Sequence, residues 1–342
     1  MYYLLSITGL AGTLATTGFL YQWIGSRSDR RRFARAGRWV KIGNGRRLYL
    51  LEKGSGEATV LFEAGIAATN LNWFHVQEKV SRFASTASYD RCGLGWSSPC
   101  GTARTPGNIA GELHEMLKCA EIKPPYILVG HSFGGLVMRK YALLYPQEVS
   151  SVILVDPMRC DEWPPLNPTK QAELDRGKRL TGCAVQIARF GLARLAIMSL
   201  LRRSGLVAER LASTAGKGGK HVLSRVRGEV SKMPQEVWPI VAAHWSRPGY
   251  YTGMRKHLIA VPETVREMQN APPIDGIPVL LLTPGKSSPL SDECLQRIGN
   301  NVQQVIATES AHWIHLDEPQ LLIDSIEKMV AAASPREAVA VS

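Results

Sequence analysis

The sequence predicts an α/β protein whose mostly parallel central sheet carries helices on both faces. Short apolar runs of strand length alternate with stretches in which apolar residues recur every three or four positions. Strands that are apolar on both faces are typical of a parallel sheet buried between helices. A second observation is the segment Gly130-His131-Ser132-Phe133-Gly134, which stands between an apolar run at 126–129 and a helical stretch at 135–144.

The expected elements follow one another along the chain with polar or Gly-rich segments between them. The first two strands are joined by Gly43-Asn44-Gly45, a strong hairpin signal. The sixth strand ends at Asp156 and Pro157. Strands are predicted at 38–42, 46–52, 59–63, 86–89, 126–129, 152–155, 279–282 and 302–307, and helices at 72–83, 109–120, 135–144 and 319–332.

Between Pro157 and Pro273 the alternation stops, and only helical patterns remain. We interpret 158–272 as a helical cap inserted into a core made of 38–157 and 273–332. This cap holds 19 Lys and Arg residues against 9 Asp and Glu, so most of the net charge of +12 lies there. Within it, 184–201 is predicted as one basic amphipathic helix, which either packs over the site or lies on an anionic membrane.

The N-terminal segment 1–26 carries no charged side chain, and six arginines follow between positions 27 and 38. An apolar run of about 20 residues crosses a bilayer, and positive charge after the run favours a cytoplasmic C-terminal side. We therefore expect residues 1–24 to anchor a cytoplasmic domain in a membrane through a basic linker at 27–37. The alternatives are a signal segment that is cleaved on export, or a helix that lies on the domain.

Charge, cysteine content and the C-terminus complete the outline. No zinc-finger, RNA-recognition or helix-turn-helix signature accompanies the positive charge, so no nucleic-acid partner is expected. The six cysteines are scattered and form no C-x-x-C pair, which favours reduced thiols in a reducing compartment over a disulfide framework. A disordered tail is expected at 333–342.

Ser132 is the candidate nucleophile. A strand, a sharp turn and a helix around G-x-S-x-G form the context of a nucleophile elbow. In such a turn the serine backbone is strained, and its hydroxyl projects above the sheet edge beside the N-terminus of the next helix. The segment around Ser132 therefore indicates nucleophilic catalysis.

A serine hydroxyl needs a base to take its proton. His312 lies between the last predicted strand and the closing helix, where a loop can bring it to the elbow. His315 is the competing candidate. His131 is held in the elbow turn itself, and we expect it to point elsewhere.

The carboxylate that orients the base is open to more than one assignment. Asp156 ends a buried strand and gives the chain order Ser, Asp, His. Asp292 and Glu293 follow the strand at 279–282. Either carboxylate can orient the base if their loop folds back toward the elbow. For the oxyanion, the backbone N–H of Phe133 follows the nucleophile, and the N–H of Ile66 follows the third strand.

Together these segments resemble the capped, esterase-like members of the α/β-hydrolase fold superfamily. The resemblance covers about 38–156 and 274–332. It implies a Ser-His-acid triad, in which Ser132 matches the nucleophile and His312 the base, with Ile66 and Phe133 as oxyanion donors and no required cofactor. The motifs that carry it are Glu63-Ala64-Gly65, the segments 89–97 and 128–135, and the segments 152–157 and 312–319.

One motif departs from this pattern. Many members carry the acid in a G-x-x-D pattern after the penultimate strand, but here the run is Gly285-Lys286-Ser287-Ser288. The departure moves the acid to Asp156, a position that some relatives use, or leaves it unfilled. The serine nucleophile separates the chain from the similar haloalkane dehalogenases and epoxide hydrolases, which attack with aspartate.

The predicted function is hydrolysis of carboxylic esters or thioesters through an acyl-enzyme, on a small lipophilic substrate, with no cofactor and no metal. The same fold hosts C–C bond hydrolases, lactonases and amidases, so fold alone does not select the bond. A non-catalytic ligand sensor on this fold is the second hypothesis, since the G-x-x-D acid is missing. A membrane-surface protein that acts through its basic cap is the third.

Overall fold

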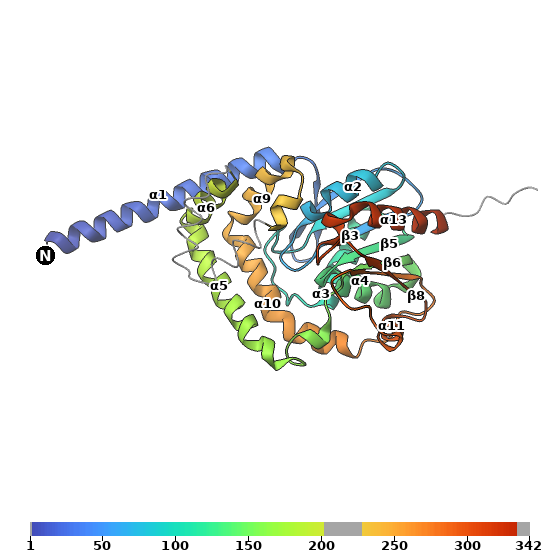
Figure 1. The fold of residues 1–342 in the computed structure, drawn as a ribbon. Coiled ribbons are helices and arrows are strands. Elements are labelled where there is room, and N and C mark those ends of the chain that lie inside the picture. The colour runs from blue at the N-terminus through green and yellow to red at the C-terminus, as the bar shows by residue number, and fades with distance from the viewer. Residues whose placement is uncertain (1, 202–227, 334–342) are drawn as a thin grey trace, which may run out of the picture.

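A computed structural model describes residues 2–201 and 228–333 of the 342-residue chain. An eight-stranded sheet forms its centre, with the strand order β1-β2-β4-β3-β5-β6-β7-β8 (Figure 1). Strand β2 is antiparallel to β1 and to β4, and every other neighbouring pair is parallel. The predicted fold class is therefore confirmed.

Every expected strand is present, with ends that differ by up to three residues from the predicted runs. In the β1–β2 turn, Asn44 and Gly45 have φ values of 59° and 67°, which a tight hairpin turn requires. The strands are β1 Arg38–Ile42, β2 Arg46–Lys53, β3 Thr59–Glu63, β4 Ser85–Asp90, β5 Tyr126–His131, β6 Val149–Val155, β7 Val279–Pro284 and β8 Val302–Ala307.

Two apolar cores lie on the two faces of the sheet, because successive side chains of a strand point to opposite faces. On β5, Leu128 belongs to one core, whereas Ile127 and Val129 belong to the other. The first core is shared with α3 (Pro106–Cys119), α4 (Phe133–Leu144) and α11 (Asp292–Ile298). The second is shared with the 3₁₀ turn Asn70–Trp73, α2 (Phe74–Val80) and α13 (Pro319–Ala333).

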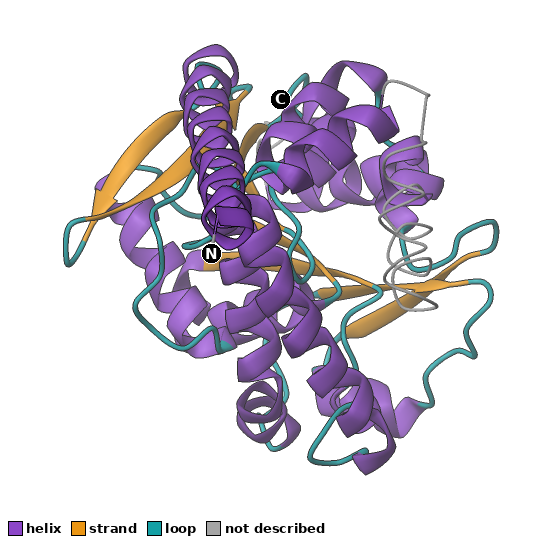
Figure 2. Ribbon diagram, turned by 90° about the vertical axis from the view of Figure 1, so that its left-hand side faces the viewer, coloured by secondary structure: helices purple, strands orange, loops and turns teal. Residues whose placement is uncertain are grey.

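Helices fill the described chain between β6 and β7. They are α5 (Gln171–Arg189), α6 (Leu192–Leu201), α9 (Trp238–Trp245) and α10 (Pro248–Gln269), and we call these four the helical insertion. They form a lobe beside the sheet in Figure 1 and stand in front of it in Figure 2. No strand occurs between β6 and β7 in the residues that the structure describes there.

The prediction of one continuous helix over 184–201 is wrong. Helix α5 ends at Arg189, and α6 begins at Leu192 in a direction 94° away. Gly191 separates them with a φ of +76°, a conformation that glycine adopts without steric cost. Two helices on either side of a sharp bend cannot present the single amphipathic face that the periodicity indicated.

Helix α1 (Tyr2–Phe33) also differs from the prediction, because it continues through the basic segment that was expected to be a linker at 27–37. Its C-terminal half is joined to the helical insertion by polar contacts. Gln22 Nε2 donates to the Ser246 carbonyl at 2.9 Å, and Arg194 pairs with Asp29 at 2.7 Å. The N-terminal half projects away from the domain (Figure 1), where Leu10 and Leu14 are exposed.

Among the described residues, no single helix is both long enough and apolar enough to cross a membrane. The bent pair Pro168–Arg189 and Leu192–Ser199 meets them only when its two helices are taken together. The anchor predicted at residues 1–24 thus finds no support among these helices, and the side chains of residues 1–8 lie outside the described part. The predicted disordered tail at 333–342 also lies outside the described residues, except for Ala333, which is the last residue of α13.

Candidate active site

Ser132 lies in the turn between β5 and α4, at the carboxyl edge of the sheet. Its φ of 53° and ψ of −120° are a strained combination for a residue with a side chain. Close packing holds the turn: a Cβ on Gly134 would lie 2.4 Å from the Glu63 carbonyl oxygen, so only glycine fits there. The Ser132 N–H donates to the Val155 carbonyl at 3.0 Å, and the side chain is half-buried. Local structure therefore matches a nucleophile elbow.

His312 and Asp156 meet beside this turn. His312 Nδ1 donates to Asp156 Oδ2 at 2.6 Å, and their side chains are 43% and 25% exposed. Asp156 directly follows β6, and its N–H donates to the Leu282 carbonyl at 2.9 Å. Asp292, the alternative acid, is instead an exposed residue at the start of α11. Of the described carboxylates, Asp156 is the one that bonds the His312 ring.

The other two histidines of this region lie beneath the His312 loop. His315 is buried in α12 (Ile314–Asp317), its ring centroid is 4.6 Å from that of Trp73, and burial lowers its pKa to about 3. His131 is buried as well, and its Nε2 donates to the His312 backbone carbonyl at 2.8 Å. The sequence did not reveal this contact, through which His131 supports the loop that carries His312.

The two candidate oxyanion donors, Ile66 and Phe133, belong to one small cluster beside Ser132. Phe133 is the first residue of α4, so its N–H has no partner within the helix. Ile66 lies in the loop after β3, and its half-buried side chain packs with the buried Phe133. Ala67 has a φ of 59° in the tight turn of this loop. Gly65 permits the loop to pack closely on the elbow, because a Cβ there would lie only 3.0 Å from His131 Nδ1.

Sequence reasoning missed a buried ion pair beneath this loop. Arg91 Nε lies 3.4 Å from Glu63 Oε1, and both side chains are 1% exposed. Arg91 also donates to the Gly65 carbonyl, and its guanidinium carbon lies 5.2 Å from the centre of the Phe133 ring. Arg91 therefore touches the neighbours of both candidate oxyanion donors. The segment 89–97 held a signal for it, since a charged residue directly follows the buried strand β4.

Helix α10 of the insertion lies against the site. A Cβ on Gly253 would lie 2.3 Å from the Gly93 carbonyl oxygen, so the helix touches the loop after β4 directly. The His257 ring stands edge-on to Phe133 with centroids 5.6 Å apart. Beside Ser132, apolar side chains form a small cluster of Ile66, Ile109, Phe133, Val137 and Met158.

Comparison with known proteins agrees with this fold. Residues 58–177 match the family model described as the alpha/beta hydrolase fold. The solved structure of the epoxide hydrolase CorEH aligns with a TM-score of 0.64 over 87% of this chain and 99% of its own, at 19% sequence identity. The chain is an α/β-hydrolase-fold protein. The solved structure of an esterase from Exiguobacterium antarcticum aligns with a TM-score of 0.58 and 17% sequence identity. The alignment covers 86% of this chain and 99% of the esterase.

Sequence similarity is confined to part of this α/β-hydrolase-fold protein. YqjL, an uncharacterized protein of Bacillus subtilis, is 32% identical over 105 residues, which are 31% of this chain and 42% of YqjL. The chain thus matches less than half the length of this relative. At such coverage, and with structural neighbours below 20% identity, the likeness supports the fold, and the chemistry has to be argued from the site.

Proposed function

We propose that this protein is a serine hydrolase that cleaves carboxylic ester or thioester bonds through an acyl-enzyme. The observation that carries the proposal is the 2.6 Å contact between His312 Nδ1 and Asp156 Oδ2, beside a serine held at a φ of 53°. A carboxylate at Nδ1 fixes the imidazole tautomer that leaves Nε2 free to accept a proton. With Asp156 in this role, the Gly285-Lys286-Ser287-Ser288 run needs no acid.

In the first half of the reaction, His312 Nε2 takes the proton from Ser132 Oγ as the oxygen attacks the carbonyl carbon. The carbonyl oxygen becomes an oxyanion, which the N–H groups of Ile66 and Phe133 stabilise. As the tetrahedral intermediate collapses, His312 gives its proton to the departing alcohol or thiol. Asp156 stabilises the imidazolium that exists between these two transfers.

In the second half, a water molecule replaces the leaving group. His312 Nε2 takes a proton from this water, whose oxygen attacks the acyl carbon of the Ser132 ester. The same two N–H groups hold the second oxyanion. His312 then returns the proton to Ser132 Oγ, and the carboxylic acid is released.

The residues next to Ser132 favour an apolar acyl group. Ile66 and Met158 are only partly buried, and they pack on the buried side chains of Phe133 and Val137. A lipophilic acyl chain that covers Ile66 and Met158 would gain about 25 cal/mol for each Å² of apolar surface that it removes from water.

Labelling with a fluorophosphonate tests this proposal, because the probe reacts with an activated serine. The wild type should be labelled and should hydrolyse p-nitrophenyl esters, whereas Ser132→Ala should do neither. Ser287→Ala is the matched control, since Ser287 is exposed in the loop after β7, and it should behave like the wild type. A folded wild type that resists the probe would overturn the proposal and favour the ligand-sensor hypothesis.

A further inference from the structure

A buried pair of cysteines lies below the Gly-rich loop that follows β4. Cys92 is fully buried and Cys100 is 6% exposed. The two Sγ atoms and a carboxylate oxygen of Glu112 all lie within 4.8 Å of one another. The loop between the cysteines is closed on itself, because the Gly93 N–H donates to the Ser98 carbonyl at 2.7 Å.

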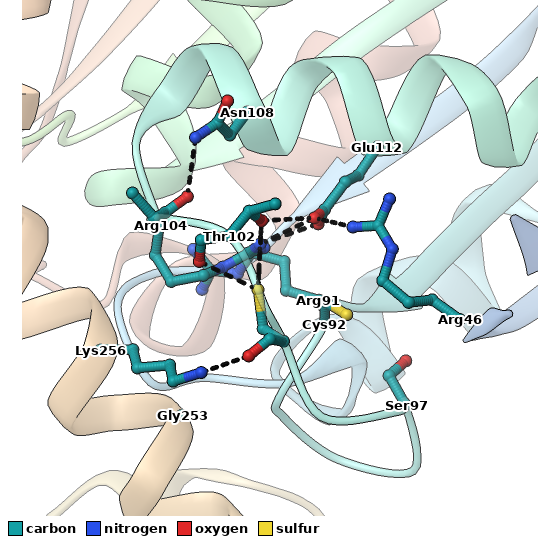
Figure 3. Close-up of polar contacts among 12 residues, drawn as sticks. Arg46, Arg91, Cys92, Ser97, Thr102, Arg104, Asn108, Glu112, Gly253 and Lys256 are labelled. Carbon is teal, nitrogen blue, oxygen red and sulfur yellow. Dashed lines mark hydrogen bonds and ion pairs between the residues drawn. The ribbon is translucent and has the colours of Figure 1, made fainter. Parts of the chain in front are cut away.

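The two thiols have different polar neighbours, and Figure 3 shows Cys92 together with Thr102, Arg104 and Glu112. Cys100 Sγ accepts a hydrogen bond from Arg104 Nη1 at 2.9 Å, and the Thr102 hydroxyl lies 3.3 Å from it. Both thiols also lie near carbonyl oxygens: Cys100 Sγ is 3.2 Å from that of Thr102, and Cys92 Sγ is 3.3 Å and 3.5 Å from those of Ser98 and Pro99. The hydrogen bond from the Arg104 cation therefore makes Cys100 the better nucleophile of the two.

The pKa values of the two thiols are shifted in opposite directions. The nearby Cys92 thiol and the charge of Arg104 lower the pKa of Cys100, against the effect of burial. The nearby Cys100 sulfur, together with burial, raises the pKa of Cys92. Cys100 is therefore the more acidic of the two thiols.

Glu112 completes the cluster, but its carboxylate is already occupied. Arg104 Nη1 lies 3.0 Å from Oε1 and 2.9 Å from Oε2, the Thr102 hydroxyl donates at 3.0 Å, and Arg46 also pairs with Oε1. A metal ion between Glu112 and the cysteines would have to displace or face two guanidinium groups, those of the buried Arg104 and the half-buried Arg46. The arrangement therefore suits redox chemistry of the thiols better than a cation.

We propose that Cys92 and Cys100 form an oxidisable dithiol, which hydrogen peroxide converts to an intramolecular disulfide. In the first step the Cys100 thiolate attacks one peroxide oxygen, the O–O bond breaks, and Cys100 sulfenic acid and hydroxide form. In the second step the sulfur of Cys92 attacks Cys100 Sγ, the S–O bond breaks, and the thiol proton leaves with the hydroxyl group as water. The two cysteines lose two electrons, and the peroxide is reduced to water and hydroxide.

Peptide mapping of the whole protein tests this proposal, because trypsin releases residues 92–104 as one peptide that contains both cysteines. The chain is treated with hydrogen peroxide, blocked with N-ethylmaleimide in denaturant and digested without reductant. The peptide should have lost two hydrogen atoms and should carry no maleimide. Cys119 and Cys183, which are exposed, should still take up maleimide at the dose that converts the buried pair.

Two variants assign the order of the steps. Cys92→Ser should stop at a sulfenic acid on Cys100, which dimedone traps, whereas Cys100→Ser should leave Cys92 unoxidised. Cys119→Ser is the matched control and should form the disulfide like the wild type. The wild-type peptide map stands by itself if a variant fails to fold.

Two outcomes would overturn the proposal. One is a peptide 92–104 that keeps both maleimides while Cys119 and Cys183 are oxidised. The other is stoichiometric binding of added Zn²⁺ that protects both thiols from maleimide in the wild type and is lost in Cys100→Ser, which would make the cluster a metal site.

Discussion

His312 with Asp156 and Arg91 with Glu63 are two base–carboxylate pairs on neighbouring parts of one sheet edge, and they differ in their access to solvent. The first pair is 43% and 25% exposed, and the second is 1% exposed on both sides. A histidine that transfers protons to a substrate has to be reachable and free to titrate. An ion pair that holds a loop in place has to keep its charges. In the proposed mechanism the first pair therefore carries out proton transfer, and the second pair positions the loop after β3.

Burial has opposite consequences for the partners of the second pair. It raises the pKa of Glu63 and lowers the pKa of Arg91, because both charged forms lose hydration. The attraction between the two charges opposes both shifts. Such a pair contributes little net stability, but the loss of one partner leaves an uncompensated buried charge.

The largest expected effect is on the exposed pair. Asp156→Asn should lower kcat for ester hydrolysis by about 10⁴-fold, because the amide no longer fixes the productive His312 tautomer. Steady-state kinetics with a p-nitrophenyl ester measure this. Asp292→Asn, at an exposed position in α11, should keep the wild-type rate. Equal losses in both variants, or a loss confined to Asp292→Asn, would reverse the assignment of the acid.

The buried pair should respond in stability. Arg91→Leu should lower the free energy of unfolding by about 3–5 kcal/mol, since Glu63 is left buried without its partner. Urea unfolding measures this, and adding Glu63→Leu should recover part of the loss. Arg297→Leu removes an ion pair with Glu293 that is 75% and 76% exposed, and it should change stability little. If Arg91→Leu were as mild as Arg297→Leu, the pair would not be a buried support.

A smaller effect concerns the pH dependence of stability. His315 has a pKa lowered to about 3 in the folded chain by burial, whereas an unfolded histidine binds its proton below about 6.5. The unfolded state thus binds the extra proton between these values, so stability falls as the pH falls through this window. From pH 6.5 to pH 5, His315 should account for a loss of about 2 kcal/mol.

His315→Phe should remove this part of the acid sensitivity. The ring contact with Trp73 can persist in the variant, and neither nitrogen of His315 has a hydrogen-bond partner among the described residues. Urea unfolding at pH 7 and pH 5 gives the difference between wild type and variant. The half-buried His75 supplies the control His75→Phe. An unchanged acid loss in His315→Phe would show that His315 is protonated when folded.

The smallest expected effect is on the support of the base. His131→Phe keeps an aromatic ring but removes the donor to the His312 carbonyl, and kcat should fall about 3- to 10-fold, as expected for one net hydrogen bond. The KM should stay unchanged, because His131 lies beneath the loop. His131→Gln, which can donate through its amide, should recover part of the rate. A rise in KM without a fall in kcat would place His131 in substrate binding instead.

The sequence by itself determined the strands, the elbow at Ser132 and the position of His312 in the loop after β8. These features are local, because they rest on periodicity within one element or on a turn motif of a few residues. The breaks were harder to predict. The amphipathic period runs unbroken over 184–201, but the chain bends at Gly191, and helix α1 continues through the expected linker.

Tertiary structure decided which distant side chains meet. Asp156 and Asp292 both follow strands in the sequence, and only the folded sheet brings Asp156 to His312. The support that His131 gives to the His312 carbonyl links residues 181 positions apart. The Arg91–Glu63 pair, and the approach of Glu112 to Cys92 and Cys100, also depend on where β3, β4 and α3 pack. Periodicity shows that a residue faces the interior, but partners inside a core are set by packing among elements that are remote in sequence.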